Sequence, residues 1–290
     1  MSRPSRNHFS VVVSGFAMLC LVSGCIMRPQ IHQQRTMQVL HQDGTALVVR
    51  TLNGSVHVNK QDGSQVTIKA DLVSQWQERL DQAQVLATRQ PDGALLIEVS
   101  FPGGARSSEG SSFEIGIPAA SGLDLESHNG GLAIAGLSGR AKLSTSNGGI
   151  DVTDHRGPVQ AHTSNGHIVL RAVAGDAAAE TTNGHVEITG ITGAANARTS
   201  NGTVHVALAD ASPGPVTVQT SNGGVDLTLG KSFVGQLDMA TSNGGVHFKS
   251  PPTVRYVSVE GHSAHLTIGH SEAVSRIRTT NGSIHVHFSE

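Results

Sequence analysis

An all-β fold, built as a parallel β-solenoid, is predicted by a repeated corner motif and by the alternating apolar residues on both sides of it. The motif is Thr-Ser-Asn-Gly or a close variant, and its Asn recurs at intervals of 18 or 21 residues, with a final interval of 38. Such a repeat predicts stacked units, each covering the next. The repeated Asn residues, which we assign to turns and to a structural ladder, are Asn129, Asn147, Asn165, Asn183, Asn201, Asn222, Asn243 and Asn281.

Apolar and polar residues alternate after every repeat Asn. The third and fifth residues after it are apolar, as in Val204 and Val206 after Asn201, and the residue between them is mostly polar. This period of two is typical of a strand with one buried face. The fourth residue before each Asn is apolar as well. Each unit therefore reads as strand, Asn-Gly corner, strand and Gly turn. Gly accepts positive φ at such corners, and Asn enters the left-handed region more easily than most residues.

Two architectures fit this pattern. Asn-Gly could close the hairpins of an antiparallel meander, or each unit could be one coil of a solenoid. The solenoid is favoured because a meander would leave one apolar face uncovered, and the repeat region offers no amphipathic helices to cover it. Stacking would also place Asn above Asn, where amides can form a hydrogen-bonded ladder. We predict about nine coils of 18–21 residues over residues 121–290, with Ser263 in the Asn position of a degenerate copy.

Residues 46–120 are less regular and are predicted to cap the first coil, because a terminal coil exposes apolar faces and unpaired strand edges. An isolated early copy of the motif lies at Asn53. The C-terminal end is expected to stop within a repeat, protected only by His285, His287 and Glu290. Within 46–120 the sequence predicts strands at 46–51, 55–59, 65–71 and 94–101, a short helix at 74–87, and a loop at 102–112.

The first 24 residues are predicted to be a signal peptide. Arg3 and Arg6 precede an apolar run of about fourteen residues, which is short for a membrane span. The sequence Leu-Val-Ser-Gly-Cys ending at Cys25 resembles the lipobox of bacterial lipoproteins. The resemblance implies cleavage before Cys25 and attachment of a lipid to its sulfur. An ordinary secretory signal is the alternative.

Several further expectations follow from a lipidated Cys25. The only other cysteine, Cys20, would be removed, so the mature protein would have no internal disulfide. Residues 25–45 are polar and are predicted to be a tether. Ile26 stands where Asp would favour inner-membrane retention, so the lipoprotein resemblance implies an exported protein of the outer membrane if the organism is Gram-negative.

The serial Asn-Gly units, together with the early copy at Asn53 and the strand at 94–97, resemble the DUF4097 family of candidate bacterial adhesins. The resemblance covers roughly residues 46–290. It implies a β-solenoid in the cell envelope, and it supplies no catalytic residues.

The chemistry of the chain points to binding and not to catalysis. The net charge of −2 gives no basic field for nucleic acid, and no catalytic motif or cofactor site stands out. A non-enzymatic, adhesin-like binding or structural module is therefore the leading hypothesis, with an envelope protein or glycan as its partner. An envelope sensor of metal or pH is the alternative, and a carbohydrate-active β-helix enzyme is a weaker one. The sensor hypothesis depends on an outward column, which we predict as Glu187, His205, Asp226, His247, Thr267 and His285.

Overall fold

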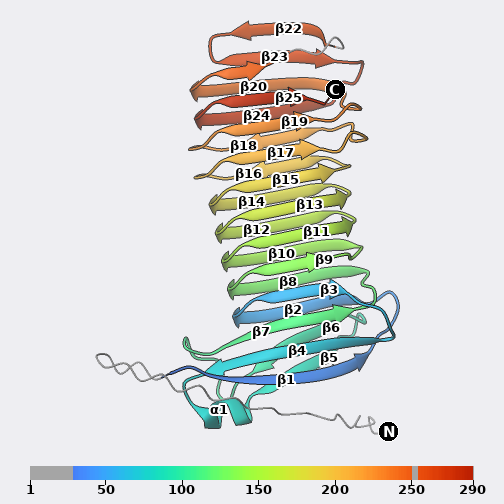
Figure 1. Cartoon of the computed structure of the whole chain (residues 1–290), viewed down its shortest axis with the longest axis vertical. Helices are drawn as coiled ribbons and strands as arrows, with labels where there is room; N and C mark the ends of the chain where they lie inside the picture. Colours follow the sequence, from blue (N-terminus) through green and yellow to red (C-terminus); the bar gives the residue numbers. More distant parts are fainter. Residues whose placement is uncertain (1–28, 250–253, 290) are drawn as a thin grey trace, which may run out of the picture.

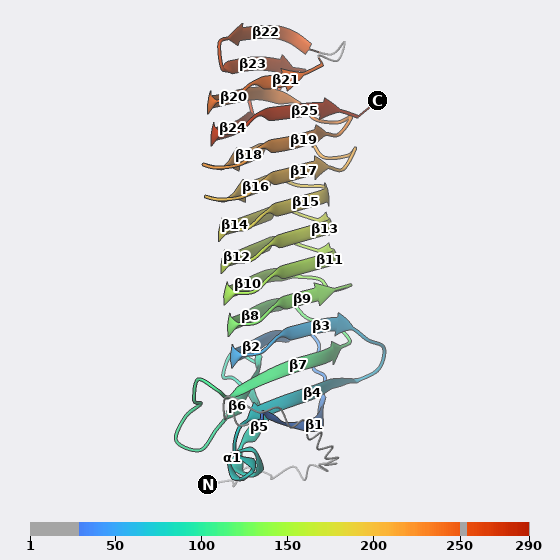
Figure 2. The same ribbon diagram turned by 60° about the vertical axis from the view of Figure 1, so that its left-hand side comes forward.

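Two long β-sheets, packed face to face, form an upright rod in the computed structural model of the chain (Figures 1 and 2). The structure describes residues 29–249 and 254–289. One sheet has 12 strands and the other has 13, and most neighbouring strands are parallel. The parallel β-solenoid is thus confirmed, and the antiparallel meander is wrong. The predicted signal peptide (1–24) and Cys25 lie outside the described residues. No helix among the described residues is long and apolar enough to span a membrane.

Nine coils carry the Asn-Gly corner. Each coil has one strand in the 13-stranded sheet, the corner, and one strand in the 12-stranded sheet. From the base upward the coils are β2 (Ala46–Asn53) with β3 (Val56–Lys60), β8 (Gly122–Asn129) with β9 (Leu132–Ala135), β10 (Arg140–Asn147) with β11 (Ile150–Arg156), β12 (Val159–Asn165) with β13 (Ile168–Ala174), β14 (Ala177–Asn183) with β15 (Val186–Ile191), β16 (Ala195–Arg198) with β17 (Val204–Leu208), β18 (Val216–Gln219) with β19 (Val225–Leu229), β24 (Val274–Asn281) with β25 (Ile284–Phe288), and β20 (Gly235–Asn243) with β21 (Val246–Phe248).

The core between the sheets is made by the predicted inward columns. Val204 and Val206 are almost fully buried, whereas His205 between them is exposed. In the middle coils the small residues Ala161 and Ala179 are buried in the same core as the larger Ile168, as expected for a thin, closely packed core. Apart from an irregularity between Thr189 and Ile191 where β15 pairs with β17, the register holds along the solenoid strands, because a shift of one residue would turn every apolar side chain toward solvent.

The base of the rod is a tenth, irregular coil with additional strands around it. β6 (Leu95–Ser100) runs parallel to β2, and β7 (Gly110–Ile117) runs parallel to β3. β4 (Gln65–Ser74) is antiparallel to β7, β5 (Gln84–Arg89) is antiparallel to β6, and α1 (Gln77–Gln82) lies between β4 and β5. The boundary predicted at residue 120 therefore does not separate two units, because β2 and β3 stack directly on β8 and β9.

Three predictions for the N-terminal part are corrected by this base. Residues 31–40, predicted as tether, form β1 (Ile31–Leu40), which pairs with β4 along its whole length. The strand was missed because polar Gln33 and Arg35 stand at positions where an alternating pattern would have apolar residues. Arg35 is nevertheless half-buried and donates to the carbonyl of Leu80. The helix is shorter than predicted, since β5 begins at Gln84. The end of the predicted loop is the start of β7.

The distal end departs from the order of the sequence. The last coil, β24–β25, lies between the coil of β18–β19 and the coil of β20–β21. The prediction of an open C-terminal coil is therefore wrong. The prediction that the degenerate copy at Ser263 forms a coil is also wrong, because β23 (Ser263–Ile268) pairs antiparallel with β20 and with β22 (Val254–Glu260). Val259 stands four residues before Ser263, where the repeat predicts an inward-facing residue, yet it is 58% exposed.

Candidate functional site: the Asn ladder and the cleft at its foot

A continuous ladder of side-chain hydrogen bonds follows the Asn-Gly corner along the rod. In each rung the Nδ2 of one Asn donates to the Oδ1 of the Asn in the adjacent coil, at 2.6–2.9 Å. All eight predicted Asn residues belong to it, and Asn53, which was predicted only as an isolated copy, forms the lowest position. In spatial order the ladder is Asn53, Asn129, Asn147, Asn165, Asn183, Asn201, Asn222, Asn281 and Asn243.

The corner is shaped by close stacking and not by left-handed Asn. Within the described residues, the non-glycine residues with positive φ are Asp154 and Ala172, and neither belongs to the ladder. The Gly after each Asn is required because the next coil approaches it closely. A Cβ on Gly166 would lie 2.1 Å from the carbonyl oxygen of Gly148. The prediction that Asn occupies the corner because it enters the left-handed region easily is therefore wrong.

Buried Thr hydroxyls tie the corners together from the inside. Thr163 is fully buried, and its hydroxyl donates to the carbonyl of Gly148 in the neighbouring coil at 3.0 Å. Thr145, Thr181, Thr199 and their equivalents make the same bond. A buried hydroxyl without a partner would be costly, so this column explains why Thr recurs two residues before Asn.

The outer side of the corner is an uncharged polar surface. We define the ladder face as the nine Asn residues together with the residue that precedes each one. Each Asn amide has two N–H donors and two acceptor lone pairs, and the ladder uses one of each in the inner rungs. The remaining groups face solvent beside a column of mostly Ser and Thr. The preceding residues are, from the base, Leu52, His128, Ser146, Ser164, Thr182, Ser200, Ser221, Thr280 and Ser242.

A cleft of about 500 Å³ opens at the foot of the ladder face. It exists because β2 and β6 pair only from Leu47–Leu95 to Val49–Ile97 and then separate. Where the coils above have a tight corner, the base coil has the loop 101–109, which stands out from the body between β6 and β7 (Figure 2). The cleft is lined by β2, by the end of β6, by this loop, and by the corner residues of β8 and β10.

The lining of the cleft combines charged groups with an apolar strip. Arg50 forms ion pairs with Asp124 at 2.7 Å and with Glu126 at 3.2 Å. Glu98 also lines the cleft and makes no ion pair within the described residues. Leu52, 46% exposed, lies against the opening. The cleft therefore offers carboxylates, a guanidinium and an apolar contact within one small volume.

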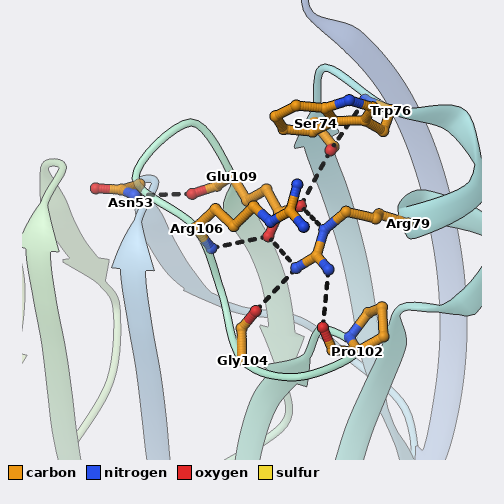
Figure 3. A network of polar contacts seen from close by, with 8 residues as sticks. All are labelled: Asn53, Ser74, Trp76, Arg79, Pro102, Gly104, Arg106 and Glu109. Atoms are coloured by element: carbon orange, nitrogen blue, oxygen red, sulfur yellow. Dashed lines mark hydrogen bonds and ion pairs between the residues drawn. The ribbon is translucent and has the colours of Figure 1, made fainter.

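The loop that borders the cleft is fixed by a buried ion pair (Figure 3). The side chain of Glu109 is fully buried and is paired with Arg79, which also donates to the carbonyls of Pro102 and Gly104 at 2.8 Å. The hydrogen bond from Arg79, helped by the N–H of Arg106, holds the pKa of Glu109 below its ordinary value. The same interaction raises the pKa of Arg79. Charges paired and bonded in this way hold a loop in one conformation.

The loop and the ladder are joined at the same place. The Nδ2 of Asn53 donates to the carbonyl of Glu109 at 2.7 Å (Figure 3). The lowest amide of the ladder is therefore hydrogen-bonded to the loop. Sequence reasoning missed this cleft because residues 102–112 showed only turn-forming residues, and the buried Arg79–Glu109 pair joins segments 30 residues apart.

The histidine column differs from its prediction. In space it runs Glu187, His205, Asp226, His285 and His247, because the last coil is interposed, and Thr267 lies in the other sheet. The rings of His285 and His247 are stacked with centroids 4.9 Å apart. Across residues 29–249 and 254–289, no group of three or more His, Cys, Asp or Glu could hold a metal ion. The column thus adds no support to a metal sensor.

Comparison with known proteins places the chain in a family. The family model described as Toastrack DUF4097 matches residues 45–287. The chain belongs to the DUF4097 family. No curated protein matches this DUF4097 chain. Solved structures similar to it are described as candidate adhesion proteins. One from Bacteroides fragilis is 12% identical, over 88% of this chain and 97% of that one, with a TM-score of 0.39. One from Parabacteroides merdae is 11% identical, over 87% and 95%, with a TM-score of 0.37. One from Clostridium sporogenes is 13% identical, over 88% and 100%, with a TM-score of 0.24.

Proposed function

We propose that this DUF4097 protein is a non-enzymatic, adhesin-like binding module of the cell envelope, anchored by a lipid on Cys25. The observation that carries the proposal is the ladder face: a straight, exposed series of amides and hydroxyls on a rigid stack of coils. Amides and hydroxyls repeated at the strand spacing of about 4.8 Å bind through many weak hydrogen bonds. Such a surface suits an extended partner, either an envelope protein or a glycan.

The position of Cys25 supports an upright orientation on the membrane. The first strand begins at Ile31, six positions after Cys25, and it belongs to the base of the rod (Figure 1). A lipid at Cys25 would hold the base near the membrane. The nine corner-bearing coils, at about 4.8 Å each, would extend the ladder face roughly 40 Å away from it.

Membrane fractionation tests the anchor. We expect the wild type in the membrane fraction, with a lipid mass on its N-terminal peptide, and the Cys25→Ala variant unmodified and released or unprocessed. Cys20→Ala is the matched control, since Cys20 lies in the predicted signal peptide and should be dispensable. In a Gram-negative host, density separation should place the wild type in the outer membrane. A wild type that is soluble and unmodified would refute the anchor.

A further inference from the structure

We propose that the cleft at the foot of the ladder face binds a linear, β-linked glycan that carries acetamido groups, and that the sugars continue along the ladder face. This inference rests on the proposed binding function and names the class of ligand. Three properties of the site carry it: the spacing of the ladder, the chemistry of the cleft, and the fixed loop that borders it.

The spacing of the ladder fits a polymer of sugars better than an extended peptide. Neighbouring coils lie about 4.8 Å apart, whereas side chains on one face of an extended peptide recur about every 6.7 Å. A peptide along the rod would therefore lose register with the amides after two or three coils. Pyranose rings linked through opposite positions advance by close to one coil spacing per sugar. Successive rings are turned over, so the acetamido groups of alternate rings can meet the ladder at every second Asn.

The free groups of the ladder match an acetamido substituent. Asn147 and Asn165 each have one N–H and one lone pair outside the ladder. Another amide is complementary to that pair, because it also has one donor and one acceptor. The ladder face is uncharged, and it therefore favours neutral amides over ionised groups.

The cleft supplies the stronger contacts at the end of this path. Carboxylates such as Glu98 and Glu126 can accept hydrogen bonds from the hydroxyl groups of a sugar, and hydrogen bonds to charged groups are the stronger ones. Leu52, 46% exposed, replaces the Ser or Thr that precedes Asn in most coils. An apolar side chain at this position can contact the methyl of an acetamido group or the C–H face of a ring.

The cleft is formed before any ligand binds. The Arg79–Glu109 pair and the bonds from Arg79 to Pro102 and Gly104 hold its outer wall. The bond from Asn53 to Glu109 holds that wall against the ladder. A site that needs no ordering on binding loses less affinity to conformational entropy.

Titration with defined saccharides tests the inference. The probe is the tetrasaccharide of β-1,4-linked N-acetylglucosamine, and its control is cellotetraose, which has the same backbone without acetamido groups. The protein is the full chain, purified from whichever cell fraction holds it, so that a failed membrane anchor does not decide this result. We expect the acetylated probe to bind at least about tenfold more tightly.

Two variants locate the site. Leu52→Ser and Glu126→Gln should each weaken binding of the acetylated probe about tenfold, with thermal unfolding unchanged. Glu180→Gln is the matched control: Glu180 faces outward in the same column as Glu126, outside the cleft, and should leave binding unchanged. Equal affinity for the two saccharides, no binding of either, or wild-type affinity in both cleft variants would overturn the proposal. Binding of an extended cationic peptide in place of the saccharides would assign the acidic cleft to a protein partner.

Discussion

Coils in the middle of the rod stack in the order of the sequence, whereas coils at its two ends do not. From β10 to β15 each coil stacks on the coil that precedes it in sequence, 18 residues away. At the base, Asn53 bonds to Asn129 across 76 residues, and at the distal end Asn281 lies between residues 59 and 38 positions earlier. The repeat therefore determines the shape of a coil and the surfaces it offers, whereas the choice of neighbour depends on the segments between coils.

The reason lies in the equivalence of the coils. Every coil offers the same Asn and Gly groups and a Thr hydroxyl, or that of Ser127 in the β8 coil, so any two coils can stack with the same hydrogen bonds. A long excursion at the base and the antiparallel β22–β23 pair at the distal end then decide which coils are adjacent. The most direct test of this comparison is to remove the interposed coil.

Deletion of residues 274–290 should have the largest effect. It removes β24–β25, which lies between β18–β19 and β20–β21. We expect the β20 amides that pair with β24 to exchange almost as fast as an unfolded peptide, because that parallel neighbour is gone, although β23 still pairs with the other edge of β20. The strands β10–β15 should remain protected. Hydrogen exchange followed by mass spectrometry measures both regions in one sample. Retained protection of the amides on the β24 edge of β20 would mean that β20 restacks directly on β18 and that neighbour order follows the sequence after all.

The same comparison explains what could be predicted from sequence. Columns such as Val204 and Val206, and the Asn ladder itself, follow from period-two alternation and from identical residues recurring at one place. The interposition of Asn281 between Asn222 and Asn243 could not follow, because all three corners are equivalent in sequence. The cleft was missed for another reason: it arises where β2 and β6 separate, which depends on a contact between distant segments.

Substitution of a corner Gly should have the second-largest effect, as a loss of stability. Gly166→Ala would place a Cβ 2.1 Å from the carbonyl oxygen of Gly148, and backbone on both sides prevents relief, so we expect a loss of about 3 kcal/mol in the free energy of unfolding. Gly244→Ala has the same clash with Gly282 but lies in the last corner-bearing coil, which can move, so its cost should be smaller. Gly131→Ala is the control, since its Cβ would be 3.5 Å from the nearest atom. Denaturant unfolding measures all three, and equal losses would contradict the comparison.

Acid should weaken the middle of the rod through His155. Its side chain is 1% exposed, Nε2 donates to the carbonyl of Gly139 at 2.7 Å, and burial lowers its pKa below the ordinary value of 6.5. Between the two pKa values only the unfolded state is protonated, so this part of the stability is complete above 6.5 and decreases as pH falls toward the folded pKa.

The variant His155→Phe isolates this contribution. It should flatten the dependence of unfolding free energy on pH from about pH 7.5 to about pH 5, while His162→Phe, at an outward-facing position, should leave the dependence unchanged. An equally steep dependence in His155→Phe would show that another group is responsible.

The smallest effect should come from the ladder amides. Asn165 donates to Asn147 and accepts from Asn183, both at 2.9 Å, whereas within the described residues the Asn243 amide makes only the bond to Asn281. Because these amides are exposed, we expect Asn165→Ala to cost about 1 kcal/mol and Asn243→Ala about half as much. A ratio near two in denaturant unfolding would show that the ladder contributes rung by rung in the middle and at the end alike. A much larger loss for Asn165→Ala would show that the rungs stabilise one another, so that the middle of the rod gains from cooperativity that its ends lack.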